Sequence, residues 1–177
     1  MKIIAIGAVT AGGKTTVVNA IKERLPRTTS LHFDDYSFEG EVDDFTECVS
    51  NKEAYYNAWD LTPLKADVEK IANSGKYDYL LLDYPFAYQN NMMKKYPDCC
   101  IFIDTPLDIA MARRIIRDMK VASADDIRNE MNTYLNCARK CYIQMLTDIL
   151  PTSDYVIDGS KELDAIINEA IGIILKL

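Results

Sequence analysis

The stretch KIIAIGAVTAGGKTT, residues 2–16, decides how this chain folds. Residues 2–7 are mostly apolar and too few for a surface helix, so they predict a buried strand. The loop that follows contains glycine and leads into an amphipathic helix that begins near Lys14. A strand that runs through such a loop into a helix is the setting of a phosphate-binding loop. The stretch therefore predicts a binding site for a nucleoside triphosphate.

The loop fits the pattern GxxxxGK[ST], except that Ala8 replaces the first glycine. Glycines let consecutive backbone N–H groups surround a phosphate, and the helix N-terminus adds partial positive charge. Lys14 is expected to reach the β- and γ-phosphates and otherwise to face solvent, and the Thr15 hydroxyl is expected to bind Mg²⁺. The alternative is a glycine-rich turn with a surface lysine. The predicted ATP-binding residues of the loop are Ala8, Val9, Thr10, Ala11, Gly12, Gly13, Lys14, Thr15 and Thr16.

The rest of the chain alternates short apolar runs with helical patterns, which predicts βαβ units. Strands are predicted at residues 2–7, 29–33, 77–83, 99–104 and 155–158. Helices are predicted to begin at Thr62, Thr105, Ser123 and Ser160, and the third is long, ending before Pro151. The expected fold class is α/β, a P-loop NTPase with a five-stranded parallel sheet flanked by helices.

The composition excludes several classes of protein. A chain of 177 residues suits a single domain, 1–177, with a full core. Its net charge of -7 leaves no basic surface for nucleic acid. Because no apolar run approaches the roughly 20 residues of a bilayer span and no signal peptide is recognisable, we expect a cytoplasmic protein without a membrane partner. One histidine and five cysteines without CxxC spacing argue against a zinc site. Oligomeric state stays open.

Three carboxylates follow predicted strands at the sheet edge where the phosphate loop lies. Asp34 and Asp35 come after the second strand, and Asp83 ends the third. One of the pair is expected to accept the proton of an attacking hydroxyl, and Asp34 is preferred over Asp35. Asp35 and Asp83 are the expected carboxylates on the Mg²⁺ side. The alternative for all three is helix capping or strand termination.

The segment 37–60 has no clear periodicity and predicts an insertion on the acceptor side. Seven acidic residues and one lysine lie between Tyr36 and Thr62, with no arginine. A monophosphate acceptor is normally neutralised by arginines, so an uncharged or cationic alcohol is favoured. A solvated acidic loop is the alternative. The residues expected to bind this acceptor are Asp35, Tyr36, Tyr55, Tyr56, Trp59, Asp60, Arg128 and Tyr134, with the aromatic rings available for stacking and Asp60 for hydroxyl groups.

Three arginines recur in the helix predicted to begin at Thr105, where a short lid of residues 113–124 is expected. Arg113 and Arg117 lie on a common face and are assigned to stabilising charge on the transferring group. Arg114 is assigned to ATP binding. The alternative is a solvated basic face of the helix, and Arg128 is an alternative ligand for a phosphate-bearing acceptor.

These motifs resemble the uridine kinase and nicotinamide riboside kinase group of phosphate-loop kinases. The resemblance covers most of the chain in order and is carried by residues 7–16, 33–36, 59–60, 113–118 and 154–159. It implies that Asp34 is the general base, that Trp59 and Asp60 hold the nucleoside, and that the lid carries Arg113 to Asp118. The chain departs from many relatives after the third strand, where it has Asp83-Tyr84-Pro85-Phe86.

Three hypotheses follow from the sequence. The first is an ATP- and Mg²⁺-dependent kinase of a nucleoside-like substrate, such as uridine, cytidine or nicotinamide riboside. The second is a phosphate-loop kinase of a nucleotide or coenzyme precursor. The third is a nucleotide-binding regulatory protein without kinase activity, against which the intact Lys14, Thr15, Asp34 and Arg117 argue.

Overall fold

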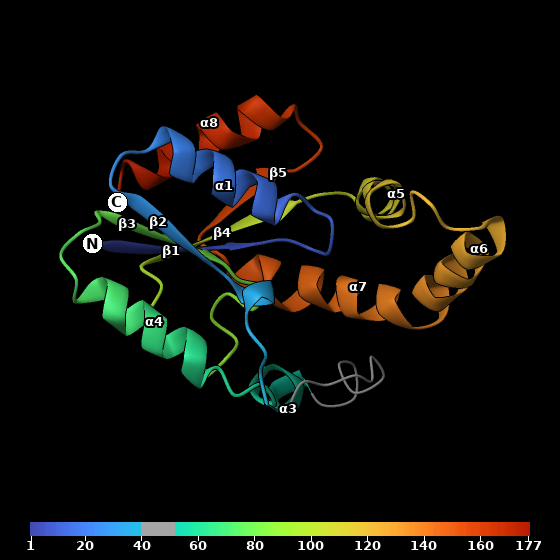
Figure 1. Cartoon of the computed structure of the whole chain (residues 1–177), viewed down its shortest axis with the longest axis horizontal. Coiled ribbons are helices and arrows are strands. Elements are labelled where there is room, and N and C mark those ends of the chain that lie inside the picture. The colour runs from blue at the N-terminus through green and yellow to red at the C-terminus, as the bar shows by residue number, and fades with distance from the viewer. Residues whose placement is uncertain (40–51) are drawn as a thin grey trace.

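A computed structural model describes residues 1–39 and 52–177 and contains one five-stranded sheet. All neighbouring strands are parallel, and their order is β2-β3-β1-β4-β5 (Figure 1). The predicted fold class is therefore confirmed. The strands are β1 (Lys2–Gly7), β2 (Thr28–His32), β3 (Tyr79–Asp83), β4 (Cys99–Asp104) and β5 (Tyr155–Asp158).

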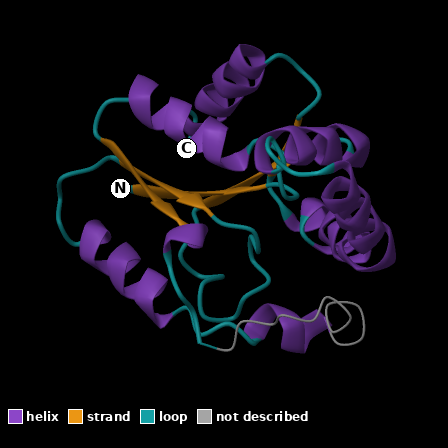
Figure 2. Ribbon diagram, turned by 45° about the vertical axis from the view of Figure 1, so that its right-hand side comes forward, coloured by secondary structure: helices purple, strands orange, loops and turns teal. Residues whose placement is uncertain are grey.

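Helices cover both faces of the sheet. Figure 2 shows α1 (Lys14–Arg24) and α8 (Leu163–Ile174) above the sheet and α4 (Thr62–Ala72) below it. None of the described helices is long and apolar enough to cross a bilayer. The remaining helices lie toward the carboxyl ends of the strands. They are α3 (Lys52–Asn57), α5 (Leu107–Asp118), α6 (Ala124–Thr133) and α7 (Arg139–Asp148), with short turns at η1 (Phe33–Asp35), η2 (Tyr134–Ala138) and η3 (Leu150–Thr152).

The core has two layers because successive strand side chains point to opposite faces. On one face Ile4 and Ile6 of β1 pack with Val18, Ile21 and other residues of α1 and α8. On the other face Leu80 and Leu82 of β3 join a larger, aromatic-rich cluster with α4. Burial on both sides explains why the central strands read as continuous apolar runs.

The predicted element bounds are mostly confirmed to within two residues, and three of the differences have a clear structural cause. Strand β2 ends at His32 because Phe33 begins a 3₁₀ turn closed by a hydrogen bond from Tyr36 N to Phe33 O (3.2 Å), which carries Asp34 off the strand. The long helix predicted from Ser123 starts there with the expected capping box but divides into α6, the π-helical η2 and α7. The last helix starts at Leu163, because the Ser160 side chain bonds to Asp158 instead of capping it.

Thr105, which directly follows β4, anchors the phosphate loop to the sheet. Its side chain is fully buried and its hydroxyl donates to the Gly12 carbonyl (2.8 Å). Gly159, which follows β5, packs against it, since a Cβ at this position would lie 2.0 Å from Thr105 Oγ1 and 2.9 Å from Thr105 Cα. The loop position therefore depends on the absence of a side chain two strands away.

We expect Gly159→Ala to lower the free energy of unfolding by about 1–3 kcal/mol, because the new methyl group overpacks against Thr105. Gly172→Ala is the matched control, since no atom lies within 4 Å of its Cβ and alanine is favoured in a helix by roughly 0.5–1 kcal/mol. Urea denaturation of both variants measures the difference. Equal stability of the two variants would contradict this account of Thr105.

Candidate active site

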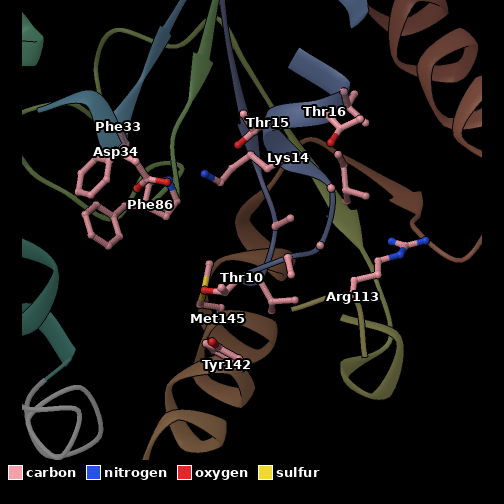
Figure 3. A pocket seen from close by; sticks show the side chains of 18 of the residues that line it. Thr10, Lys14, Thr15, Thr16, Phe33, Asp34, Phe86, Arg113, Tyr142 and Met145 are labelled. Atoms are coloured by element: carbon pink, nitrogen blue, oxygen red, sulfur yellow. The ribbon is translucent and has the colours of Figure 1, made fainter. Parts of the chain in front are cut away.

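A cavity of about 610 Å³ opens at the carboxyl ends of the strands, next to β1. This is where parallel α/β sheets bind ligands. Its wall joins the phosphate loop to residues from several distant segments (Figure 3). The predicted site residues that line it are Ala8, Val9, Thr10, Ala11, Gly12, Gly13, Lys14, Thr15, Thr16, Asp34, Tyr55, Tyr56, Trp59, Arg113 and Arg117.

The phosphate loop is shaped so that its N–H groups face the cavity. Gly13, with φ of +99°, is the N-cap of α1, and within the described residues no side chain caps this helix end. At Gly12 a Cβ would lie 2.8 Å from Val9 O and 2.9 Å from the Cβ of Ala8. The methyl group of Ala8 thus occupies space that Gly12 leaves free. An uncapped helix N-terminus behind such a loop suits the phosphates of a nucleotide.

Asp83, at the end of β3, is the centre of a buried polar cluster. Its side chain is 2% exposed and forms an ion pair with the Lys14 ammonium group. The Thr15 hydroxyl donates to Asp83 Oδ2 (2.6 Å), and His32 Nδ1 lies 3.0 Å from the same oxygen. Burial alone would raise the pKa of Asp83, but Lys14, Thr15 and His32 together hold it below its usual value. The carboxylate is therefore charged at neutral pH.

The contacts of Asp83 differ from the expectation for Lys14 and add His32 to the residues near the site. Lys14 is not solvent-facing, because its side chain is only 14% exposed and is paired with Asp83. Its loss should affect stability as well as binding. His32 at the end of β2 contacts Asp83 and also Ser30 Oγ (3.1 Å from Nε2). Ser30 and His32 lie two residues apart and so share one face of β2, which was the available signal.

The acceptor end of the cavity is built from aromatic rings around Asp34. Asp34 is exposed in the η1 turn, and Figure 3 shows the Lys14 ammonium pointing toward it. Phe33 and Phe86 lie 5.4 Å apart between ring centroids, and Trp59 lies within 6 Å of both. Burial raises the pKa of Tyr55, so its hydroxyl stays protonated. A flat ring would find an apolar wall here, with a carboxylate beside it.

Five of the predicted acceptor residues, Arg128 among them, do not line the cavity. Asp35 is exposed and does not line the cavity. The Tyr36 hydroxyl donates to Asp67 of α4 (2.9 Å). Asp60 accepts hydrogen bonds from the backbone and hydroxyl of Thr62, so it serves the start of α4. Tyr134 is buried in η2 and lines a second groove with α5.

Two of the predicted arginines line the cavity and two do not. Arg113 lines the cavity, and in Figure 3 its side chain extends away from Lys14. Arg117 lines it as well, and hydrogen bonds to Asp118, with a smaller contribution from Asp34, raise its pKa. Arg114 instead bonds to Glu130 (2.7 Å) and to the Tyr142 hydroxyl (2.8 Å), which ties α5 to α6 and α7. Arg128 is exposed and paired with Asp125.

Several residues that line the cavity were not predicted from the sequence. Phe86 and Pro85 come from the loop after β3, and α7 brings residues that an amphipathic pattern assigns only to packing. Lys161 comes from the turn before α8. Phe86, Tyr142 and Gln144 are among these additional lining residues.

The residues present fit a nucleotide and Mg²⁺. Two oxygen groups, the Thr15 hydroxyl and the Asp83 carboxylate, meet directly behind the uncapped N-terminus of α1. Oxygen ligands and phosphates are the usual surroundings of Mg²⁺. Within the described residues, no cluster of three or more His, Cys, Asp or Glu side chains forms a metal cage. An ion here would therefore depend on the phosphates for most of its ligands.

Relatives and solved structures resemble the chain over most of its length, although no family model matches it. A uridine kinase of Staphylococcus epidermidis is 27% identical over 180 residues, covering 88% of this chain and 86% of that protein. A uridine kinase of Borrelia hermsii is 26% identical over 178 residues, covering 88% and 84%. A solved deoxyadenosine kinase of M. mycoides, 12% identical, covers 99% of this chain and 100% of its own with a TM-score of 0.53. A solved Eubacterium ventriosum protein, 17% identical, covers 99% of both chains with a TM-score of 0.56. The predicted P-loop NTPase fold is confirmed.

We expect Lys14→Met to lower the free energy of unfolding at pH 7 by about 3 kcal/mol, because it leaves the Asp83 carboxylate buried without its countercharge. The native pKa of Asp83 is depressed, so the pair stabilises the fold above the unfolded pKa and this contribution is lost as pH falls through the native pKa. The gap between wild type and variant should therefore shrink below about pH 4. Denaturation curves across pH measure it.

The double variant Lys14→Met/Asp83→Asn is the control, because it removes both charges and should recover most of the lost stability. A loss of the same size at every pH, or no recovery in the double variant, would count against the buried pair.

Proposed function

We propose that this chain, a uridine kinase-like P-loop kinase, transfers the γ-phosphoryl group of ATP to a hydroxyl group of a nucleoside. The observation that supports this best is that one cavity joins the phosphate loop to an aromatic wall, with Asp34 between them. A donor and a flat acceptor can therefore meet in the same space. The length of the match to the two uridine kinases adds support.

The donor end is assigned to the loop and the arginines. The N–H groups at the start of α1 bind the phosphates, and Lys14 moves from Asp83 to the phosphate oxygens when they are present. Thr15 and Asp83 would hold Mg²⁺, which when bound neutralises charge on the β- and γ-phosphates. Arg117 and Arg113 stabilise the negative charge that spreads over the transferring group.

Asp34 is assigned the role of general base. The acceptor hydroxyl oxygen bonds to the γ-phosphorus, its proton passes to the Asp34 carboxylate, and the bond from the γ-phosphorus to the bridging oxygen breaks to release ADP. Asp34 suits this role because it lines the cavity, is exposed, and lies close enough to Arg117 to interact with its charge. Asp35, outside the cavity wall, suits it less.

The acceptor end favours an uncharged ring. Among the described residues that line it, Phe33, Tyr55, Tyr56, Trp59 and Phe86 are aromatic and none is basic. The basic lining residues belong to the loop, to α5 and to the turn before α8. A second phosphate on the acceptor would therefore lose its hydration at this end without gaining a countercharge.

We expect Asp34→Asn to lower kcat by about 10²-fold or more while leaving the affinity for ATP unchanged, because asparagine keeps the shape but cannot take a proton. Asp35→Asn, the neighbouring control, should have a milder effect. Steady-state kinetics and a separate ATP-binding titration distinguish the two steps. Equal or reversed effects would move the base to Asp35.

We expect uridine, cytidine or nicotinamide riboside to be phosphorylated with kcat/KM at least about tenfold above any nucleoside monophosphate, since a like-charge mismatch costs on the order of 1.4 kcal/mol. A panel of nucleosides and monophosphates assayed for ADP release measures this ratio. Turnover of a monophosphate alone would show that arginines such as Arg113 or Arg128 hold the acceptor. ADP release with no member of the panel would favour a regulatory protein.

A further inference from the structure

The cavity wall contains a glutamine whose buried side chain forms no hydrogen bond within the described residues. Gln144, on α7, is 7% exposed, and within the described part of the chain neither its amide nitrogen nor its amide oxygen forms a hydrogen bond. The neighbouring Tyr56 hydroxyl donates to Asp148 Oδ2 (3.4 Å), and the nearby Gln144 amide opposes the rise in the pKa of Tyr56 that burial causes, without reaching hydrogen-bond geometry. A buried amide without partners destabilises a fold, so its presence calls for an explanation.

The chain's other glutamine shows what a purely structural role looks like. Gln89 donates from its amide nitrogen to the Asp148 carbonyl (3.1 Å) and to the Thr152 hydroxyl (3.2 Å), and it does not line the cavity. Gln144 occupies a more buried position with fewer bonds. Packing alone would be served better at this position by leucine or methionine.

A second polar atom in the same wall is also without a partner. The indole nitrogen of Trp59 is buried and forms no hydrogen bond within the described residues, although the ring packs against Phe33 and Phe86. Together Trp59 and Gln144 leave two donors and one acceptor unused at the aromatic end of the cavity. The flexible glutamine side chain can turn its amide toward a ligand without movement of the backbone.

We propose that Gln144 determines base specificity by pairing with the polar edge of a pyrimidine nucleoside, with Trp59 donating to the O2 carbonyl of the base. The uracil edge carries two acceptors on either side of one N–H donor, which complements two donors and one acceptor. The cytosine edge carries the same numbers and is met by a flipped glutamine amide. A purine such as adenine offers fewer acceptors on its pairing edge. This inference rests on the proposed nucleoside kinase function and narrows its substrate class.

The test compares Gln144→Met with Gln89→Met on uridine and on 3-methyluridine, in which a methyl group replaces the N3 hydrogen. Wild type should prefer uridine by at least about tenfold in kcat/KM, as expected for a site built around hydrogen bonds. Gln144→Met should lose at least about tenfold on uridine, mainly through KM, and little on 3-methyluridine. The preference should then fall toward one.

Thermal unfolding of the free protein separates a binding role from a structural one. Gln144→Met should melt at the wild-type temperature or above, because it replaces an unpaired buried amide with an apolar group of similar size. Gln89→Met should melt lower, since it loses two hydrogen bonds, while its preference for uridine stays unchanged.

Each contrary result has its own meaning. An unchanged preference in Gln144→Met, or an equal loss on both substrates with a lower melting temperature, overturns the role of Gln144 while the kinase assignment stands. Wild-type turnover of purine nucleosides alone overturns the pyrimidine assignment in the same way. Absence of ADP release with every nucleoside overturns the proposed function, and this inference with it.

Discussion

The buried Asp83 carboxylate is the constraint on which the rest of the site depends. A charge with only 2% exposure must be neutralised and hydrogen-bonded, and the ends of β3 and α1 meet so that Lys14 and Thr15 can do this. The same two side chains belong to the phosphate loop. Folding of the sheet therefore places the loop's functional groups before any ligand is present, and the loop and sheet become a single unit.

The opposite side of the loop is held by a different kind of contact. Thr105 donates to Gly12, and it can approach only because Gly159 has no side chain. Ala8 replaces the glycine of the usual pattern at a place where Gly12 leaves room for a methyl group. The loop thus tolerates alanine at position 8 because position 12 is glycine. Its shape depends on contacts between pairs of residues as well as on the motif.

The sequence predicted what local chemistry and periodicity determine. Short-range patterns predicted the strand, loop and helix around Lys14. They also predicted that the strands are parallel and that Asp34 follows the second strand. The cavity wall could not be predicted in the same way, because Phe86, Trp59 and Gln144 come from separate segments that only the tertiary fold brings together. Asp60 was expected to bind the acceptor because it lies beside Trp59; it accepts a hydrogen bond from Thr62 and does not line the cavity, so that role stays a prediction. Part of the acidic segment, residues 40–51, lies outside the described residues.

The π-helical turn η2 sets which face of α7 meets the cavity. An extra residue in a helix rotates everything after it by about 100° around the axis. Arg114 binds Glu130 of α6, which precedes this turn, and Tyr142 of α7, which follows it. One side chain therefore contacts the helical segments on both sides of η2. The face that packs against the lid and the face that lines the cavity are therefore offset by a single residue. Within one continuous helix, the two surfaces can change their amino acids independently during evolution, provided that the count of residues between them is kept.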